Sequence, residues 1–385
     1  MKQYLNTAFL STYPPRECGI ATFTQDLVTA LKKAGSIKPG VIAVNDTTYK
    51  YGGDVIYELP QQDRKSYADM ADRLNRSDIQ VLVIEHEYGI YGGQSGKYLL
   101  DLTSRVKKPI IATLHTVLPH PDESQKGILR QLCAESAEIV TMASNSRKIL
   151  CDVYGADPSK ISVIHHGVPV FDLPSREDLK KQSRLENRTV ISTFGLISPG
   201  KGLEYGIRAV AEVVKKHPDI LYMIIGQTHP VVKRQFGETY RMSLEKIVDD
   251  CGLRQNVRFI NRYLEKEELV RYIKLSDIYM TPYLGKDQAV SGTLAYAAGY
   301  GRVIVSTPYL YAREMLADGR GMLAEFRNPR SLADCINYLM ENPDKKAEME
   351  KKMQEFGKAM TWENVADSYK KVFLKAAGKS GDVNE

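Results

Sequence analysis

The stretch IYMTPYLGKDQAVSGTLAYAAGYGRVIVSTP, from Ile278 to Pro308, establishes the fold class because it contains a strand, a loop, a helix and a second strand. The apolar run Ile278 to Thr281 ends at Pro282, a residue that commonly stops a strand. Small residues compatible with a helix run from Ser291 to Ala298, and a second buried strand is expected from Val303 to Ser306. This order is typical of a parallel sheet whose strands are joined by helices.

The start of this expected helix is the first candidate binding site. Ser291, Gly292 and Thr293 offer unpaired backbone N–H groups, two hydroxyls and the positive end of a helix dipole. Together these groups suit a phosphate or the hydroxyls of a sugar. An ordinary Ser/Thr helix cap has the same sequence, so both interpretations stay open.

Short apolar runs of the same kind recur along the chain in two sets. The first set is 7–11, 41–44, 81–84, 110–114, 139–142 and 161–164, and the second is 190–194, 221–225, 257–260, 278–281 and 303–306. Strands without polar alternation, separated by helical stretches, predict parallel sheets covered on both faces. We therefore expect an α/β protein of two facing, doubly wound Rossmann-like domains, with the ligand at the carboxyl ends of the strands in an interdomain cleft.

The length of 385 residues also predicts two domains. We place the first at residues 1–170 and the second at 188–358. Between them, residues 171–187 are charged, contain proline and hold no expected strand, so they are interpreted as a linker.

Composition excludes several classes of protein. Hydrophobic residues make up 43% and charged residues 26% of the chain, which is typical of a globular protein. The net charge of +6 is scattered, which suits anionic substrates and at most peripheral membrane contact but not nucleic acid. No apolar run reaches the ~20 residues that span a bilayer, and no signal peptide is recognisable, so we expect a cytoplasmic protein. The five cysteines form no C-x-x-C pair, which argues against zinc and against disulfides.

A glycine-rich loop, GLISPGKG from Gly195 to Gly202, follows the first strand of the second set. It matches most of the phosphate-binding pattern G-x-x-x-x-G-K and precedes a helix. Gly202 stands where a Ser or Thr hydroxyl would hold magnesium, so a nucleoside triphosphatase is not expected. Close backbone approach and the charge of Lys201 still suit a diphosphate. The alternative for Lys201 is a solvated lysine at a helix start.

Polar residues of the first set also follow strands. Arg16 and Gly19 lie in a connection longer than a simple turn requires, and Gly19 lets a ligand approach the backbone at a helix start. His86 and Glu87 follow one strand and His115 follows the next, where side chains at carboxyl ends meet the ligand. We expect one of the two histidines to be structural. The spacing H-E-x-x-H is absent, so no metal is expected.

Taken together, these residues resemble the retaining glycosyltransferases of family 4, which have the GT-B fold. The similarity covers nearly the whole chain and rests on the order and spacing of PPRECGIATF (14–23), ISVIHHGVP (161–169), FGLISPGKGLEYGIRAV (194–210) and SGTLAYAAGYGRVIVSTPYL (291–310). Trp362 and Glu363 are similar to the family's C-terminal segment. This implies that residues 359–378 form a helix that crosses back to the first domain and that 379–385 are a tail.

The resemblance implies transfer of a hexose, of mannose or glucose type, from a nucleotide sugar to a carbohydrate or glycolipid acceptor with retention of anomeric configuration. It implies no metal and no cofactor, because basic groups and helix N-termini carry the leaving diphosphate. It places the donor mainly on the second domain, at Lys201 and the amides near residues 291–293, with Gly19 on the opposite side. His115 matches the histidine near the reacting sugar, and Arg16, His86 and Glu87 are the acceptor-side candidates.

Two departures from the family affect the donor site. Gln288 and Tyr296 stand where the family carries a pair of glutamates, the second of which holds the nucleotide ribose. Leu196 stands where an arginine usually accompanies the lysine. Candidates for replacing the lost groups are Asp287, Arg262 and Arg147.

The first hypothesis is therefore a metal-independent hexosyltransferase. The missing ribose carboxylate motivates two alternatives. One is a disaccharide phosphorylase of the same fold, with inorganic phosphate at Lys201 and residues 291–293. The other is a sugar-binding protein that has lost catalysis.

Overall fold

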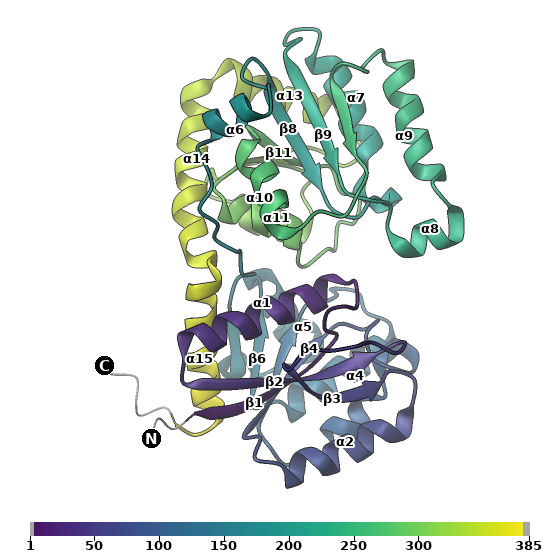
Figure 1. The fold of residues 1–385 in the computed structure, drawn as a ribbon, viewed down its shortest axis with the longest axis vertical. Coiled ribbons are helices and arrows are strands. Elements are labelled where there is room, and N and C mark those ends of the chain that lie inside the picture. The colour runs from purple at the N-terminus through teal and green to yellow at the C-terminus, as the bar shows by residue number, and fades with distance from the viewer. Residues whose placement is uncertain (1–3, 380–385) are drawn as a thin grey trace. The chain divides into compact units, whose positions relative to one another are not determined.

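The computed structural model describes residues 4–379, and the chain forms two compact units. The first unit consists of Met1–Gly167 with Thr361–Glu385, and the second is Val168–Met360. Each contains one parallel sheet with helices on both faces (Figure 1). The predicted α/β class with two Rossmann-like parallel-sheet domains is confirmed. The predicted tail, 379–385, lies outside the described residues except for Lys379.

The first unit has a seven-stranded sheet in the order β3-β2-β1-β4-β5-β6-β7. Its strands are β1 (Leu5–Ser11), β2 (Ile37–Asn45), β3 (Val55–Pro60), β4 (Val81–His86), β5 (Ile110–Leu114), β6 (Glu138–Thr141) and β7 (Ile161–Val163). Its helices are α1 (Gly19–Ala34), α2 (Arg64–Arg76), α3 (Leu99–Thr103), α4 (Glu123–Glu135), α5 (Ser144–Tyr154) and α15 (Trp362–Ala376).

The two faces of this sheet carry different helices. Helices α2 to α5 bury side chains such as Tyr67 and Leu132 against Leu82 and other inward residues of the strands. Helices α1 and α15 pack against each other beside the other face, where Phe373 of α15 lies edge-on to Phe9 of β1, 5.9 Å between ring centroids. Apolar burial of this kind is the main favourable term in folding.

The second unit has a six-stranded parallel sheet in the order β10-β9-β8-β11-β12-β13. Its strands are β8 (Thr189–Phe194), β9 (Ile220–Ile225), β10 (Val257–Ile260), β11 (Ile278–Thr281), β12 (Val303–Ser306) and β13 (Met322–Leu323). Its helices are α6 (Arg176–Gln182), α7 (Leu203–Val213), α8 (Pro230–Phe236), α9 (Thr239–Asp250), α10 (Lys266–Leu275), α11 (Gly292–Gly299), α12 (Leu310–Met315), α13 (Pro329–Glu341) and α14 (Pro343–Gly357). Helices α7, α9 and α13 bury their apolar side chains in one core with the strands, while α11 packs on α14 and both contact β12.

The eleven predicted strands are present, and β3 and β13 are the two that the sequence did not reveal. Strand β3 is at the edge of its sheet, where Leu59 is its one buried residue, and its apolar run of three residues ends at Glu58. Strand β13 has only two residues. The segment predicted as a linker, 171–187, contains α6, whose Leu179 is buried in the second unit.

The order of strands reverses once in each sheet. In the first unit β2 and β3 lie on one side of β1, and β4 lies on the other side. In the second unit β9 and β10 lie on one side of β8, and β11 lies on the other side. At such a switch point the loops that follow the two strands diverge, and ligands bind at the carboxyl ends there. The loops after β1 and β4, and after β8 and β11, are therefore where each unit can hold a ligand.

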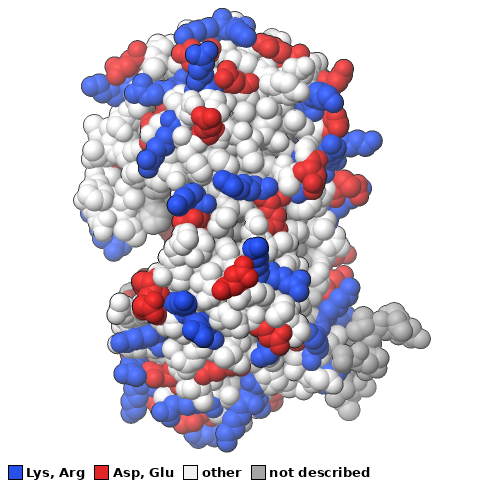
Figure 2. Space-filling model, turned by 180° about the vertical axis from the view of Figure 1, so that it is seen from behind, with Lys and Arg blue, Asp and Glu red and all other residues white. Residues whose placement is uncertain are grey.

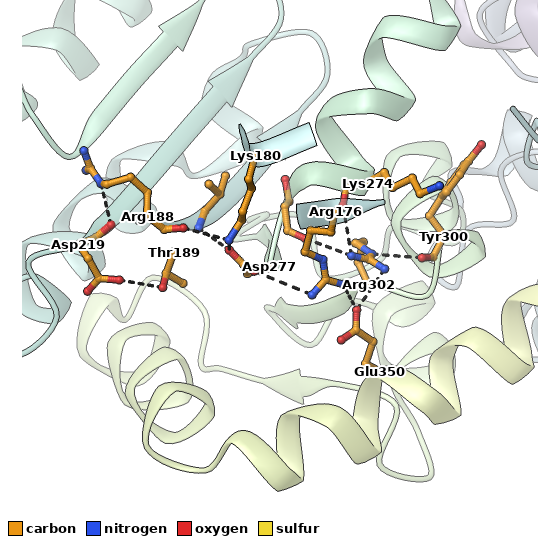
Figure 3. A network of polar contacts seen from close by, with 12 residues as sticks. Arg176, Lys180, Arg188, Thr189, Asp219, Lys274, Asp277, Tyr300, Arg302 and Glu350 are labelled. Atoms are coloured by element: carbon orange, nitrogen blue, oxygen red, sulfur yellow. Dashed lines mark hydrogen bonds and ion pairs between the residues drawn. The ribbon is translucent and has the colours of Figure 1, made fainter. Parts of the chain in front are cut away.

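The opposite ends of the strands in the second unit carry a buried network of charges (Figure 3). Asp277, just before β11, accepts a hydrogen bond of 2.7 Å from the backbone N–H of Val190 and pairs with Lys180 of α6. The side chains of Lys180 and Asp277 are only 13% and 11% exposed. This pair attaches the segment that enters the unit to the centre of its sheet.

Glu350 of α14 extends this network by pairing with Arg176 of α6 and with Arg302, whose guanidinium is 3.1 Å away. Burial, and to a smaller extent the nearby charge of Arg176, lower the pKa of Arg302 to about 10, whereas Glu350 and Asp277 act in the opposite direction. The two carboxylates therefore hold α6, α14 and the start of β12 together.

We predict that Asp277→Asn destabilises the second unit by about 3 kcal/mol, because the change leaves Lys180 buried without its anion. Asp249→Asn is the matched control, since Asp249 pairs with Arg254 at the surface and its loss costs roughly 0.5 kcal/mol or less. Urea unfolding followed by circular dichroism measures both. Trp362, the single tryptophan, lies in the first unit, so its fluorescence gives an internal reference. Equal effects of the two substitutions would contradict a structural role for the network.

Candidate functional site

The loop after β8 requires glycine at two positions. Gly195 has a φ of +130° and Gly202 a φ of +58°, values that other residues rarely adopt. A Cβ at Gly202 would lie 2.2 Å from the carbonyl oxygen of Pro282. A Ser or Thr cannot occupy this position, which explains physically why the magnesium-binding hydroxyl of the P-loop pattern is missing.

Lys201 lies at the end of this loop and faces the loop that follows β11. Its Nζ is 3.8 Å from the ring centroid of Tyr283, and the Tyr283 hydroxyl is 2.7 Å from Oγ1 of Thr293. The Tyr283 ring in turn stacks on Tyr309, with 5.5 Å between centroids. Among residues 4–379 no carboxylate pairs with Lys201. An aromatic face orients an ammonium group without neutralising it, so the charge of Lys201 stays available to an anion.

The start of α11 contains the other predicted donor residues. Ser291 is the N-cap, and its Oγ accepts a hydrogen bond of 3.3 Å from the N–H of Leu294, so the cap interpretation is correct for this hydroxyl. The same Oγ is 3.1 Å from Oγ1 of Thr293. The first N–H groups of a helix lack partners within it, so the amides of Gly292 and Thr293 are suited to bind an anion beside Lys201.

Gln288 and Tyr296 both take part in packing around this helix. The Gln288 amide donates a 3.0 Å hydrogen bond to the carbonyl of Val290. Tyr296 is 8% exposed and lies edge-on to Phe194, 6.2 Å between centroids. At position 296 the protein therefore has a phenol on a nearly buried ring where the family carries a carboxylate.

The two arginines considered as replacements for the lost basic residue have other partners. Arg262 forms a two-pronged ion pair with Glu268 at the surface. Arg147 belongs to the first unit, where it donates to the carbonyl of Pro158 at 3.2 Å.

In the first unit, Gly19 is the first residue of α1, and no atom lies within 4 Å of the place a Cβ would take. The backbone is therefore open to a ligand at this helix start. Arg16 donates to the carbonyl of Val44 at 3.0 Å and to Gln61 at 3.2 Å, and its side chain is 13% exposed. Its guanidinium holds the loop after β1 to the ends of β2 and β3.

His115 forms a buried pair with Glu85. Its Nε2 is 2.8 Å from one carboxylate oxygen of Glu85, whose other oxygen is buried without a partner. Burial raises the pKa of Glu85, and the hydrogen bond from His115 opposes that rise. Because the carboxylate accepts from Nε2, the neutral imidazole carries its proton there and presents Nδ1 as an acceptor. The pair is thus arranged to orient His115 for contact with a ligand.

His86 is the structural histidine of the two. It is 1% exposed and packs edge-on to Tyr88 and face-on to Tyr91, with centroids 4.9 Å and 6.3 Å away. Burial lowers its pKa to about 3, so the ring stays neutral. Glu87 accepts a hydrogen bond from the hydroxyl of Thr116, which joins the ends of β4 and β5.

An aromatic cluster surrounds His115. Phe23 of α1 lies edge-on to His115 at 4.8 Å, to His166 at 5.1 Å and to Trp362 at 5.2 Å. Burial lowers the pKa of His166 to about 4. Residues far apart in sequence, from α1, the end of β7 and the start of α15, therefore meet at the carboxyl end of β5.

The candidate residues lie outside a wide groove on the second unit. A surface groove of about 830 Å³ lies between α7 and α13, lined by Arg208, Arg330 and Asn337 among others, and contains none of the predicted site residues. A much smaller pocket lies at the end of β8 and is lined by Gly195, Leu196 and Lys201. We place the site by chemistry and topology and not by volume, because the wide groove follows the outer surfaces of two helices.

The described residues, 4–379, include neither a membrane-spanning helix nor a metal cluster. None of the described helices is long and apolar enough to cross a membrane. The same residues contain no group of three or more His, Cys, Asp or Glu side chains placed to hold a metal ion.

Sequence reasoning did not single out Tyr283 and considered Glu85 only as a candidate metal ligand, whereas these two residues contact Lys201 and His115. Tyr283 directly follows Pro282 after β11, and Glu85 is the penultimate residue of β4. Their places at the ends of switch-point strands were the available signal, but only the structure shows what each side chain touches.

The fold of this chain is similar to that of solved structures. The structure of Anabaena Alr3699/HepE in complex with UDP aligns with a TM-score of 0.75 at 16% identity, over 96% of this chain and all of that one. Sucrose-phosphate synthase from Thermosynechococcus elongatus aligns with a TM-score of 0.74 at 15% identity, over 96% and 98% of the two chains. These likenesses show the fold, which is that of the GT-B glycosyltransferases.

Sequence comparison identifies the family to which the chain belongs. Residues 18–170 match the family described as Glycosyltransferase Family 4, and residues 175–360 match Glycosyl transferases group 1. The D-inositol 3-phosphate glycosyltransferase of Corynebacterium efficiens is 24% identical over 88% of this chain and 82% of that protein. This chain belongs to the family 4, group 1 glycosyltransferases, and the resemblance first seen in its motifs is confirmed.

The buried histidines predict acid sensitivity of the first unit. Native pKa values of about 3 for His86 and about 4 for His166 lie below the ordinary 6.5, so below pH 6.5 the unfolded chain binds protons that the native unit rejects. The free energy of unfolding therefore decreases as the pH is lowered below 6.5, by about 1.4 kcal/mol per pH unit for each histidine. The raised pKa of Glu85 acts in the opposite direction and reduces the combined dependence of the unfolding free energy on pH.

Urea unfolding between pH 7 and 5, followed by Trp362 fluorescence, measures this slope. His86→Phe keeps a ring between Tyr88 and Tyr91 but cannot be protonated. The slope in this variant should be lower by about 1.4 kcal/mol per pH unit. An unchanged slope would show that His86 takes up no proton on unfolding.

Proposed function

We propose that this glycosyltransferase transfers a hexose, of glucose or mannose type, from a nucleotide sugar to a carbohydrate or glycolipid acceptor with retention and without a metal. Support comes from relatives: Alr3699/HepE has been solved with UDP and with UDP-glucose. The aligned D-inositol 3-phosphate glycosyltransferases act, by their names, on a phosphorylated polyol.

The observation that carries the proposal is Lys201, a cation with an aromatic ring and no carboxylate beside it, next to the first turn of α11. Negative charge develops on the diphosphate as the glycosidic bond breaks, and fixed donors are most effective where charge develops. Lys201 and the amides of Gly292 and Thr293 supply such donors from protein groups, so the reaction needs no metal cation.

His115 is proposed to contact the transferring sugar. Glu85 accepts the hydrogen bond from Nε2 of His115, which leaves Nδ1 to accept one from a sugar hydroxyl. The Glu85 carboxylate also favours positive charge on the imidazole–sugar pair as an oxocarbenium-like centre forms. Gly19 is proposed to line the diphosphate from the first unit. The acceptor is proposed to lie on the first unit, near Glu87.

A second candidate is a phosphorylase of the same fold. It is favoured by one observation: Tyr296, nearly buried against Phe194, replaces the carboxylate that would hold a ribose. In that reaction inorganic phosphate, not a nucleotide, would occupy the place beside Lys201.

Thermal stabilisation distinguishes the two candidates without an acceptor. The ligands to compare are UDP, GDP, ADP, their hexose conjugates and inorganic phosphate. We expect one nucleotide and its conjugate to raise the melting temperature. A ligand stabilises the state that it binds, by about 2.7 kcal/mol at a hundredfold excess over Kd. A shift with phosphate and none with any nucleotide would replace the transferase by the phosphorylase.

Lys201→Met keeps the length of the side chain and removes its charge. We expect nucleotide affinity to fall by about 10- to 100-fold, the range for loss of one charge-assisted hydrogen bond, and kcat to fall more than KM rises. Lys216→Met, which removes an exposed lysine paired with Glu341, is the control and should change neither. Unchanged binding by Lys201→Met in isothermal titration would remove Lys201 from the donor site.

A further inference from the structure

The segment that follows β9 in the second unit has reversed polarity, with polar groups inside and apolar groups outside. Thr228 is 2% exposed and donates to Glu238, and Arg241 is 4% exposed. Arg241 contacts Glu238 at 3.3 Å and donates to the carbonyl of Gly226 at 3.2 Å. These contacts fasten α8 and the start of α9 to the end of β9.

The same segment exposes its large apolar side chains. Val231 is 47%, Phe236 66% and Met242 64% exposed. A short helix in a globular protein ordinarily turns such residues inward. Here α8 has no buried residue among those described, and its Lys233 pairs with Glu238, which Thr228 and Arg241 contact in turn.

A fourth exposed apolar residue lies at the same edge of the sheet. Tyr263, 57% exposed, follows β10, which is the neighbour of β9. The described residues include nine exposed large apolar side chains, and four of them come from these two connections. Clustering of this kind marks an interaction surface, whereas single exposed apolar residues need no explanation.

Basic residues accompany the cluster. Lys233 and Arg234 stand between Val231 and Phe236 on α8, and both are exposed. Lys233 is 3.3 Å from Glu238, and no partner of Arg234 is found among residues 4–379. The side of this unit that carries α8 appears in Figure 2 as an uncharged bulge at the left of the view, with basic atoms at its lower edge.

We propose that Val231, Phe236, Met242 and Tyr263, with Lys233 and Arg234, form a docking surface for an anionic lipid bilayer, named here the α8 surface. Apolar side chains enter the boundary between headgroups and acyl chains, and cations contact lipid phosphates. A protein partner or a second copy would have to offer an apolar patch ringed by acid, whereas an anionic bilayer supplies both over its whole area. Surface binding of this kind needs no membrane-spanning helix.

The α8 surface lies at the carboxyl edge of the sheet, the edge where β8 and β11 hold the candidate donor residues. If the proposed transferase activity holds, this placement favours an acceptor carried by a lipid. The docking itself does not rest on that activity, so the two can fail separately.

Flotation with vesicles of phosphatidylcholine, alone or mixed with phosphatidylglycerol, tests the proposal on the full chain. The protein should float with the mixed vesicles and not with phosphatidylcholine alone, and salt should weaken binding. Phe236→Ser with Met242→Ser should reduce binding by about tenfold or more, and Lys233→Gln with Arg234→Gln should remove the preference for anionic lipid.

Leu323→Ser with Tyr338→Ser is the matched control, since both residues are exposed apolar side chains of the same unit outside the α8 surface. Circular dichroism checks that each variant folds. Absence of flotation, or equal losses in the control and the α8 variants, would overturn the proposal. So would self-association in analytical ultracentrifugation that Phe236→Ser with Met242→Ser abolishes, because the α8 surface would then bind a second copy. Nucleotide binding measured on the same samples reports separately on the proposed function.

Discussion

The pairing of β1 with β4, and of β8 with β11, determines where the loops that carry Gly19 and Lys201 lie in their units. Parallel strands put all their carboxyl ends at one edge, and the reversal of strand order makes neighbouring loops diverge there. In the second unit this places the glycine loop after β8 opposite the loop and helix after β11. Lys201 and Thr293, 92 positions apart, thereby come to share Tyr283 as a neighbour.

The two edges of the second sheet use charge in opposite ways. At the amino ends, Asp277 and Glu350 neutralise the buried cations of α6 and of Arg302, so the charges serve stability. At the carboxyl ends, Lys201 is held by an aromatic ring and has no such counter-ion in the described structure. A charge left unneutralised beside a helix start is suited to bind an anion, and here the anion is proposed to be a diphosphate.

In the first unit two adjacent residues, Glu85 and His86, have different roles. Glu85 and His86 point to opposite faces of β4, because side chains alternate along a strand. Glu85 orients His115, whereas His86 packs between Tyr88 and Tyr91 and is held neutral by burial. Sequence reasoning named His86 as an acceptor-side candidate and expected one of the two histidines to be structural, and His86 is the more deeply buried, at 1% exposed.

The order of apolar runs was enough to predict the parallel sheets and the two-domain class, because these features are local and periodic. The family was identified instead from the resemblance of motifs such as FGLISPGKGLEYGIRAV (194–210). Strand β3 escaped because its apolar run is only three residues long. The partners of single side chains were decided only in three dimensions. Ser291 proved to be a helix cap, Arg262 an ion-pair partner of Glu268, and Tyr283 the support of Lys201. Such contacts join residues distant in sequence, and no local pattern encodes which of several polar groups will meet when the strands align.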